Sequence, residues 1–125
     1  MTKYEIGRLG EESVCTYLEN LGYKIIVRNY RIKGGEIDII AQNDKYTAFV
    51  EVKARKPDSI VSGLEAVNKR KQSLIIKTAS DFCCKNSDIL QPRFDVAEVI
   101  IDNGTVLSID YIFNAYDTTG YNFIF

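Results

Sequence analysis

The sequence contains no histidine, which removes the side chain most often used as a general base and as a transition-metal ligand. It has three cysteines, Cys15, Cys83 and Cys84, an odd number that argues against a secreted disulfide framework. Without histidine, a neighbouring pair of cysteines does not build a common zinc site. We therefore expect buried or half-buried free thiols. An enzyme with this sequence must use carboxylates and lysines for its chemistry.

Long apolar runs are also missing. No stretch approaches the ~20 residues that are needed to cross a membrane, so no membrane contact is expected. The first five residues lack the apolar segment of a secretory signal, and no repeat or interdomain linker follows. With 125 residues, of which 46% are hydrophobic and 26% charged, the chain is expected to form one cytoplasmic domain over residues 1–125.

The net charge of −1 conceals an uneven distribution of charge along the chain. Residues 1–23 carry a net charge of −2, residues 24–77 carry +6, and residues 78–125 carry −5. A basic central third suits a phosphate backbone. The alternative is a solvated helix face around Lys69, Arg70 and Lys71, and charge alone does not decide between the two. No aromatic residue adjoins this basic patch, which argues against a protein that stacks single-stranded bases.

The residue pattern predicts an α/β fold in the order α-β-β-β-α-β-β, with a mixed sheet of about five strands flanked by helices. Thr2 and Glu5 form a capping box that opens a helix ending near Asn20, with Gly22 just past its end. Short turns join the next three strands into an antiparallel meander. The expected strands are residues 23–30, 36–42, 47–54, 94–101 and 106–113, and the expected second helix is residues 64–85.

Two further segments complete this prediction. Asp102, Asn103 and Gly104 are typical of a tight hairpin turn between the last two strands. The apolar segment 116–125 is either a last core strand or a contact with a partner.

Glu11 is an acid on the inward side of the first predicted helix. The apolar stripe of this helix is Val14, Leu18 and Leu21, and a step of three residues back from Val14 reaches Glu11. Gly7 and Gly10 remove side chains beside it, where another backbone or a substrate could approach. The alternative is a frayed first turn, because each glycine costs about 1 kcal/mol of helix stability relative to alanine.

Two strands place acids inside apolar, β-branched runs, where a strand that only had to pack would carry valine or threonine. Alternation puts Glu36, Asp38 and Ile40 on one face of the second strand, with Ile37, Ile39 and Ala41 on the other. On the third strand Phe49, Glu51, Lys53 and Arg55 share a face. If the hairpin pairs these faces, Asp38, Glu51 and Lys53 converge. The alternative is a surface ladder of charges.

Such a cluster is suited to a divalent cation and a phosphodiester. Opposed like charges destabilise a sheet, and a cation between Asp38 and Glu51 would remove that penalty. Mg²⁺ takes oxygen ligands and needs only one or two carboxylates plus substrate phosphate, so Mg²⁺ or Mn²⁺ is the expected cofactor. The metal would activate a water molecule. Lys53 would hold or deprotonate that water, or neutralise the charge of the transition state.

The sequence resembles the YraN family of uncharacterised bacterial proteins, in the PD-(D/E)XK nuclease superfamily, which is similar to archaeal Holliday junction resolvases. The resemblance covers nearly the whole chain. It is carried by residues 7–11 (GRLGE), 21–23 (LGY), 28–30 (RNY), 35–38 (GEID), 49–55 (FVEVKAR), Lys71 and 93–96 (RFDV). It implies a restriction-endonuclease-like domain that acts on nucleic acid, with DNA, including branched DNA, as the expected substrate. Because the resolvases are dimers, it also implies a homodimer.

Position by position, the resemblance makes Asp38 and Glu51 the metal-binding acids, Lys53 the catalytic lysine and Glu11 an acid supplied by the first helix. Phosphate contacts would come from five basic residues: Arg55, Lys56, Lys69, Arg70 and Lys71. Glu36 shares the face of Asp38 and either supports it from behind or has a structural role in the turn. Asp95 is expected to hold Arg93 or a turn rather than a metal.

The leading hypothesis is therefore a metal-dependent endonuclease in which Glu11, Asp38, Glu51 and Lys53 are catalytic. A nucleic-acid-binding or adaptor protein that keeps the fold with weak or no catalysis is the second hypothesis. A purely structural interaction module is the third. They differ in turnover, in salt-dependent binding of nucleic acid and in stabilisation by metal.

Overall fold

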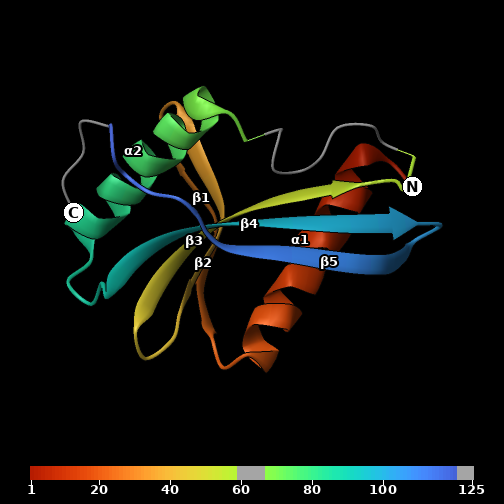
Figure 1. Cartoon of the computed structure of the whole chain (residues 1–125), viewed down its shortest axis with the longest axis horizontal. Coiled ribbons are helices and arrows are strands. Elements are labelled where there is room, and N and C mark those ends of the chain that lie inside the picture. Colours follow the sequence, from red (N-terminus) through yellow and green to blue (C-terminus); the bar gives the residue numbers. More distant parts are fainter. Residues whose placement is uncertain (59–66, 121–125) are drawn as a thin grey trace.

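The protein forms a five-stranded sheet with one helix against each face (Figure 1). The structure, a computed structural model, describes residues 1–58 and 67–120. The order of the elements is the predicted one, and the α/β fold is confirmed. The helices are α1 (Lys3–Asn20) and α2 (Lys69–Lys85), and the strands are β1 (Lys24–Ile32), β2 (Gly35–Gln42), β3 (Tyr46–Arg55), β4 (Gln91–Asp102) and β5 (Thr105–Tyr116).

The sheet is mixed, with the strands in chain order from β1 to β5. β3 and β4 are parallel, because α2 lies in the crossover between them, and every other pair is antiparallel. The predicted meander and the last hairpin are therefore confirmed. Asn103 and Gly104 both have positive φ, 50° and 76°, as the primed turns of two-residue hairpins require.

The sequence predicted the start of α1 correctly but not the start of α2. Thr2 caps α1 and forms the expected capping box with Glu5, and Gly22 follows the helix with φ of 95°. The predicted start of the second helix at Leu64 is wrong. Leu64 lies outside the described residues, but Val67 and Asn68 are not helical, and the Asn68 side chain accepts the backbone N–H of Lys71. An asparagine cap thus begins α2 at Lys69.

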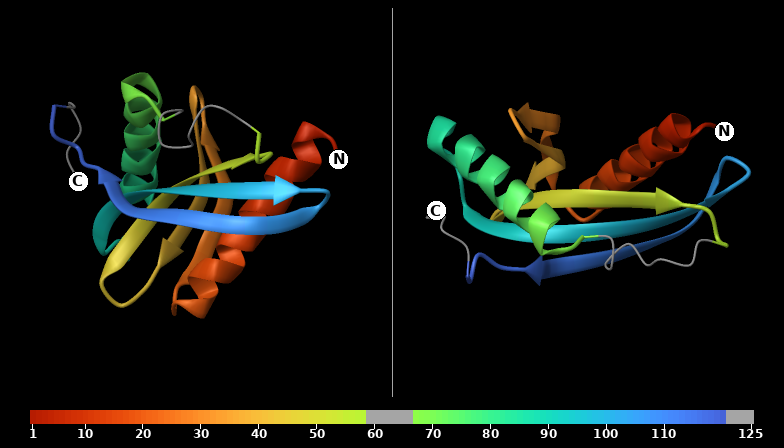
Figure 2. Two further views of the ribbon diagram at one scale, coloured as in Figure 1. Left: turned by 45° about the vertical axis from the view of Figure 1, so that its right-hand side comes forward. Right: turned by 90° about the horizontal axis from the view of Figure 1, so that it is seen from above.

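Each face of the sheet carries its own apolar cluster. Val14 and Leu18 of α1 pack on Ile39, Val50 and their neighbours in β4. On the opposite face α2 covers an aromatic cluster, in which Phe49 and Phe94 stack at 5.5 Å. In both views of Figure 2 the β1–β2 hairpin lies between α1 and α2. The edge of the sheet at this hairpin is therefore flanked by both helices.

The predicted alternation along β2 is wrong at Ile37. Ile37 packs in the α2 cluster together with Ile40, whereas Ile39 packs in the α1 cluster. Residues two apart in a regular strand lie on the same face of the sheet. Ile37 and Ile39 lie on opposite faces, so the regular alternation of β2 is broken at Asp38. The partner strand β1 is irregular at the same level, because Asn29 has a φ of 55°. The break lies where the pairing of β2 with β3 ends, at Ile39 opposite Val50.

Two glycines allow the helices to approach the strands that carry the acids. A Cβ on Gly10 would lie 2.7 Å from the Cβ of Ala54, so α1 packs directly against β3 and brings the neighbouring Glu11 with it. The sequence had left open a close approach or a frayed turn, and Gly10 serves the close approach. A Cβ on Gly35 would lie 2.1 Å from Oγ1 of Thr78 in α2.

Gly35→Ala is expected to destabilise the protein by about 1–3 kcal/mol, the usual cost of overpacking a close contact. Urea unfolding measures this change. Adding Thr78→Ala removes the clashing hydroxyl, so the double variant should lose less stability than the sum of the two single variants. If the two effects simply add, the contact between Gly35 and Thr78 does not limit the packing of α2.

The remaining expectations concern cysteines, membranes and the C-terminus. Cys15 is buried and Cys83 half-buried, as predicted, but Cys84 is exposed; all three are free thiols. No helix within residues 1–58 and 67–120 is long and apolar enough to span a membrane. β5 ends at Tyr116, and residues 121–125, which hold most of the apolar C-terminal segment, lie outside the described residues.

Candidate active site

Asp38 and Glu51 form a carboxyl pair at the point where β2 separates from β3. The register that pairs Ile39 with Val50 places Asp38 opposite Glu51 when it is continued by one residue. The backbone N–H of Val52 donates to Oδ2 of Asp38 at 2.8 Å, so the side chain takes a hydrogen bond that a regular ladder would give to a backbone carbonyl.

The protonation of Asp38 is strongly perturbed. Burial and the negative charge of Glu51 raise its pKa to about 8, against the opposing effect of the Val52 N–H. Glu51 itself is buried, with 5% of its surface exposed. Two carboxyls in this position repel each other when both are ionised, and a cation placed between them would remove the repulsion. Within the part of the chain that the structure describes, however, no group of three acidic or cysteine side chains could together hold a metal ion.

Two lysines approach the same oxygen of Glu51. Nζ of Lys53 lies 3.3 Å and Nζ of Lys71 lies 3.2 Å from Oε1. Lys53 comes from the same strand, two residues further on, whereas Lys71 comes from the first turn of α2. Burial lowers the pKa of Lys71, but the attraction and hydrogen bond of Glu51 outweigh it, so the pKa is raised and the side chain stays charged. The centre therefore combines two carboxyls with two ammonium groups.

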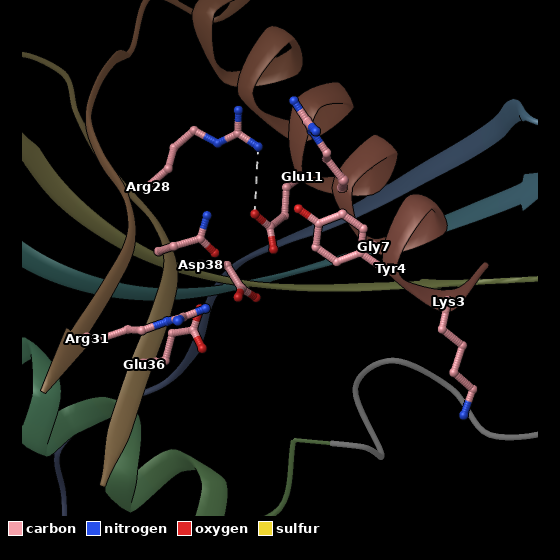
Figure 3. Close-up of a pocket in the computed structure, with 10 residues that line it drawn as sticks. Lys3, Tyr4, Gly7, Glu11, Arg28, Arg31, Glu36 and Asp38 are labelled. Carbon is pink, nitrogen blue, oxygen red and sulfur yellow. Dashed lines mark ion pairs between the residues drawn. The ribbon is translucent and has the colours of Figure 1, made fainter. Parts of the chain in front are cut away.

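Glu11 faces the same space as Asp38. Both line an open pocket of about 810 Å³ between α1 and the β1–β2 hairpin (Figure 3). Burial raises the pKa of Glu11, while Arg28 and a hydrogen bond with Asn29 oppose this shift. The Glu11 carboxylate lies 3.7 Å from Nη2 of Arg28, across the pocket. The structure thus brings all four predicted catalytic residues to one region and shows that Glu11 is engaged by one cation of β1, Arg28.

Glu36 lies at the rim of this pocket, with Oε1 3.3 Å from Nε of Arg31 on the neighbouring strand. Arg31 and Glu36 are opposite each other in the register of the β1–β2 hairpin. The side chain of Glu36 is therefore held toward Arg31, although its charge still acts on Glu11.

The basic residues that the resemblance assigned to phosphate contacts occupy different positions. Arg55 is largely buried, and its guanidinium pairs with Glu98 of β4. Lys56 lies beside the β4–β5 turn, where it lines a separate small pocket. Lys69 and Arg70 are exposed at the start of α2, next to Lys71. Of this set, Lys71 contacts Glu51 of the carboxyl pair directly.

Asp95 belongs to a buried polar cluster on the α1 side of the sheet. Nη2 of Arg93 donates to Oδ2 of Asp95 at 2.9 Å, and the Tyr111 hydroxyl donates to the same oxygen at 2.6 Å. Arg93 also donates to the Tyr23 hydroxyl at 2.7 Å. The expectation that Asp95 holds Arg93 is confirmed.

Sequence reasoning missed the other residues that line the pocket around Asp38. Tyr4 and Arg8 come from α1, and Arg28, Asn29 and Arg31 come from β1. The signal for the first two was their spacing of seven and three residues before Glu11, which places them on one side of a helix. For β1, strict alternation puts Arg28 and Tyr30 on one face. The positive φ of Asn29 instead leaves Arg28 in the pocket, while Tyr30 donates to Asp81 of α2.

The model of the uncharacterised protein family UPF0102 matches residues 10–99, a range that contains Glu11, Asp38, Glu51, Lys53 and Lys71. The chain belongs to the UPF0102 family. It is similar to a UPF0102 protein of Alkaliphilus metalliredigens, with 47% identity over 112 residues, which cover 89% of this chain and 96% of that protein.

Other members of UPF0102 are nearly as similar. The protein SYO3AOP1_0546 of Sulfurihydrogenibium is 46% identical over 99 residues, covering 77% of this chain and 84% of that protein. The protein of Trichlorobacter lovleyi is 42% identical over 116 residues, covering 90% of each. Membership of this family confirms the YraN-type resemblance. The name UPF0102 states no activity, so the chemistry has to be argued from the site.

Proposed function

We propose that this UPF0102 protein is a metal-dependent endonuclease that hydrolyses phosphodiester bonds in nucleic acid. The observation that carries the proposal is a pair of opposed carboxyls, the half-buried Asp38 and the buried Glu51, with two lysines at Glu51. A purely structural role gives no reason to place two carboxyls opposite each other with little exposure to water. A site for a divalent cation and a phosphodiester gives that reason, because each component neutralises the others.

The donor set fits Mg²⁺ or Mn²⁺. Asp38 and Glu51 supply hard oxygen ligands, and Mg²⁺ is commonly held by one or two carboxylates, with water and substrate phosphate completing its shell. When bound, the metal would lower the pKa of a water molecule and stabilise charge on the phosphate oxygens.

The residues of this chain have separate tasks in the proposed hydrolysis. In the reaction the oxygen of a water molecule bonds to phosphorus, one phosphorus–oxygen ester bond breaks, and the leaving oxygen takes up a proton. Lys53, held by Glu51, positions the attacking water or neutralises the phosphoryl oxygens. Lys71 faces the same carboxylate from α2 and supplies a second positive charge. Glu11 holds Arg28 toward the pocket.

The substrate is proposed to be DNA, including branched DNA, through the resemblance to the resolvases. A cleavage assay tests the function with duplex, single-stranded, flapped and four-way-junction DNA and with RNA, each with Mg²⁺, Mn²⁺ or a chelator. We expect cutting only with metal. Glu51→Gln should reduce the cutting rate by about a thousandfold or more. The change removes the charge of one residue that is both a proposed metal ligand and the partner of the two lysines.

Glu19→Gln is the matched control, since it makes the same change at an exposed position of α1. It should cut like the wild type. Cutting that is equally fast with Glu51→Gln would show that the nuclease activity does not come from this site.

A nucleic-acid-binding protein without efficient catalysis is the second candidate. One observation favours it, namely that no third carboxylate joins Asp38 and Glu51 in a ligand group within residues 1–58 and 67–120. This candidate predicts salt-dependent binding that survives Lys53→Ala, with no turnover under either metal. Metal-dependent cutting by the wild type rules it out.

A further inference from the structure

The pocket beside Asp38 has features that bear on the shape of its substrate, and the inference drawn from them rests on the proposed function. Its α1 wall is formed by Tyr4, Gly7, Arg8 and Glu11, which follow the helical spacing of one face. Tyr4 is 74% exposed, so its ring is not part of the core. In Figure 3 the ring lies beside Glu11.

Gly7 keeps this wall open. A Cβ at Gly7 would have nothing within 4 Å, so no packing contact requires glycine there. The consequence is that position 7 carries no side chain into the pocket beside the exposed Tyr4. A planar group can therefore enter next to the ring.

The opposite wall carries guanidinium groups that are held in place. Arg28 and Arg31 of β1 lie 3.7 Å and 3.3 Å from carboxylates of Glu11 and Glu36. On the α1 wall, Arg8 lies 3.4 Å from Glu12. The pocket is lined by four basic and three acidic residues, so its net charge is only weakly positive. Electrostatic attraction to phosphate is correspondingly modest here, and an apolar contact must carry more of the binding.

The volume of the pocket limits what can enter. About 810 Å³ lies in the range of sites for small molecules, which is room for one or two nucleotides. A base can stack on an exposed ring only when it is not paired and stacked in a duplex. The sequence argued against base stacking because no aromatic residue adjoins Lys69–Lys71. In the structure the exposed aromatic residue, Tyr4, comes instead from the N-terminal helix.

We propose that this pocket binds a single-stranded segment of nucleic acid, with one base stacked on Tyr4 and the adjoining phosphates between Arg8, Arg28 and Arg31. The segment leads to Asp38 and Glu51, so the enzyme acts on single strands or on the unpaired part of a flap or junction. Tyr4 is thus a specificity-determining residue for the proposed reaction.

Fluorescence anisotropy tests this proposal with two labelled oligonucleotides of equal length and charge, one with bases and one fully abasic, in a chelator to prevent cutting. The wild type should bind the strand with bases about tenfold more tightly, an effect of the size that one stacked base contributes. Tyr4→Ala should lose this preference, whereas Tyr4→Phe, which keeps the ring, should retain it.

Leu107→Ala is the matched control, because it removes an apolar side chain of similar exposure, 56%, from β5. It should retain the preference. A wild type without preference, or a Tyr4→Ala variant that keeps it, would overturn the single-strand site. If the wild type cuts nucleic acid in a manner that depends on Glu51 but shows no preference governed by Tyr4, only this inference fails. A preference governed by Tyr4 without cutting under any metal would overturn the nuclease function and leave the binding site.

Discussion

Asp38→Asn is expected to abolish metal-dependent cleavage, by about a thousandfold or more, and at the same time to make the metal-free protein more stable. Asparagine can still accept the N–H of Val52, so the local backbone is retained. What changes is the charge that faces Glu51. A residue that served only the fold would not behave in this way, because its removal would cost stability.

The gain in stability should depend on pH. The pKa of Asp38 is raised to about 8 in the folded protein, above its ordinary value near 4, so the folded state binds more protons than the unfolded state between these values. The wild type therefore loses stability as pH rises through this range. The stability of Asp38→Asn relative to the wild type should increase as the pH rises above 5. At pH 8 the difference should reach about 1–3 kcal/mol, the cost expected for an uncompensated buried polar group.

Urea unfolding at several pH values without metal measures this difference. Asp44→Asn, at an exposed position, is the matched control and should show no such trend. A variant Asp38→Asn that is less stable than the wild type at pH 8 would mean that the carboxylate supports the fold.

Arg93→Ala is expected to give the largest loss of stability, about 3–5 kcal/mol, because it leaves Asp95 as a buried charge without its cation. Asp95 is fully buried, and Arg93 makes three hydrogen bonds with it besides the one to Tyr23. Proteins of this size have total stabilities of about 5–15 kcal/mol, so the variant should melt at a temperature lower by the order of 10–20 °C.

The exposed pair of Arg31 and Glu36 provides the comparison, since Arg31→Ala breaks an ion pair of similar length at the surface. Its loss should cost less than about 1 kcal/mol. Differential scanning calorimetry of both variants tests the contrast. Equal losses of stability in the two variants would contradict the view that burial makes the cluster around Asp95 important for the stability of the fold.

Local signals in the sequence predicted much of the fold. The cap at Thr2, the glycine after α1 and the turn at Asn103 and Gly104 each depend on neighbouring residues, so they are readable without the tertiary structure. Leu64 was a wrong helix start, because apolar spacing was given more weight than the cap that Asn68 provides.

The convergence of Asp38 and Glu51 was predicted correctly although the alternation behind it fails at Ile37. Register explains this result. The pairing of Ile39 with Val50 brings the next residues of both strands together, whichever way the pleat turns there. Strand order and register thus determined this part of the site, and both follow from the short turn between β2 and β3.

Contacts between distant elements were beyond the sequence. The position of Lys71 depends on how α2 lies over the sheet, where Gly35 allows the close approach to Thr78. The position of Tyr4 depends on the packing of α1 against β3 through Gly10. Each requires three-dimensional placement that a pattern in one segment does not contain, and the positive φ of Asn29 required the same.

A crystal of the wild type soaked in Mn²⁺, with anomalous data, is the most direct test of the central claim. The account predicts one anomalous peak bound by carboxylate oxygens of both Asp38 and Glu51, and no such peak in Asp38→Asn soaked in the same way. The account would be contradicted if a wild-type crystal soaked to saturation in Mn²⁺ showed no peak at this pair. A peak that persists unchanged in Asp38→Asn would also contradict the account.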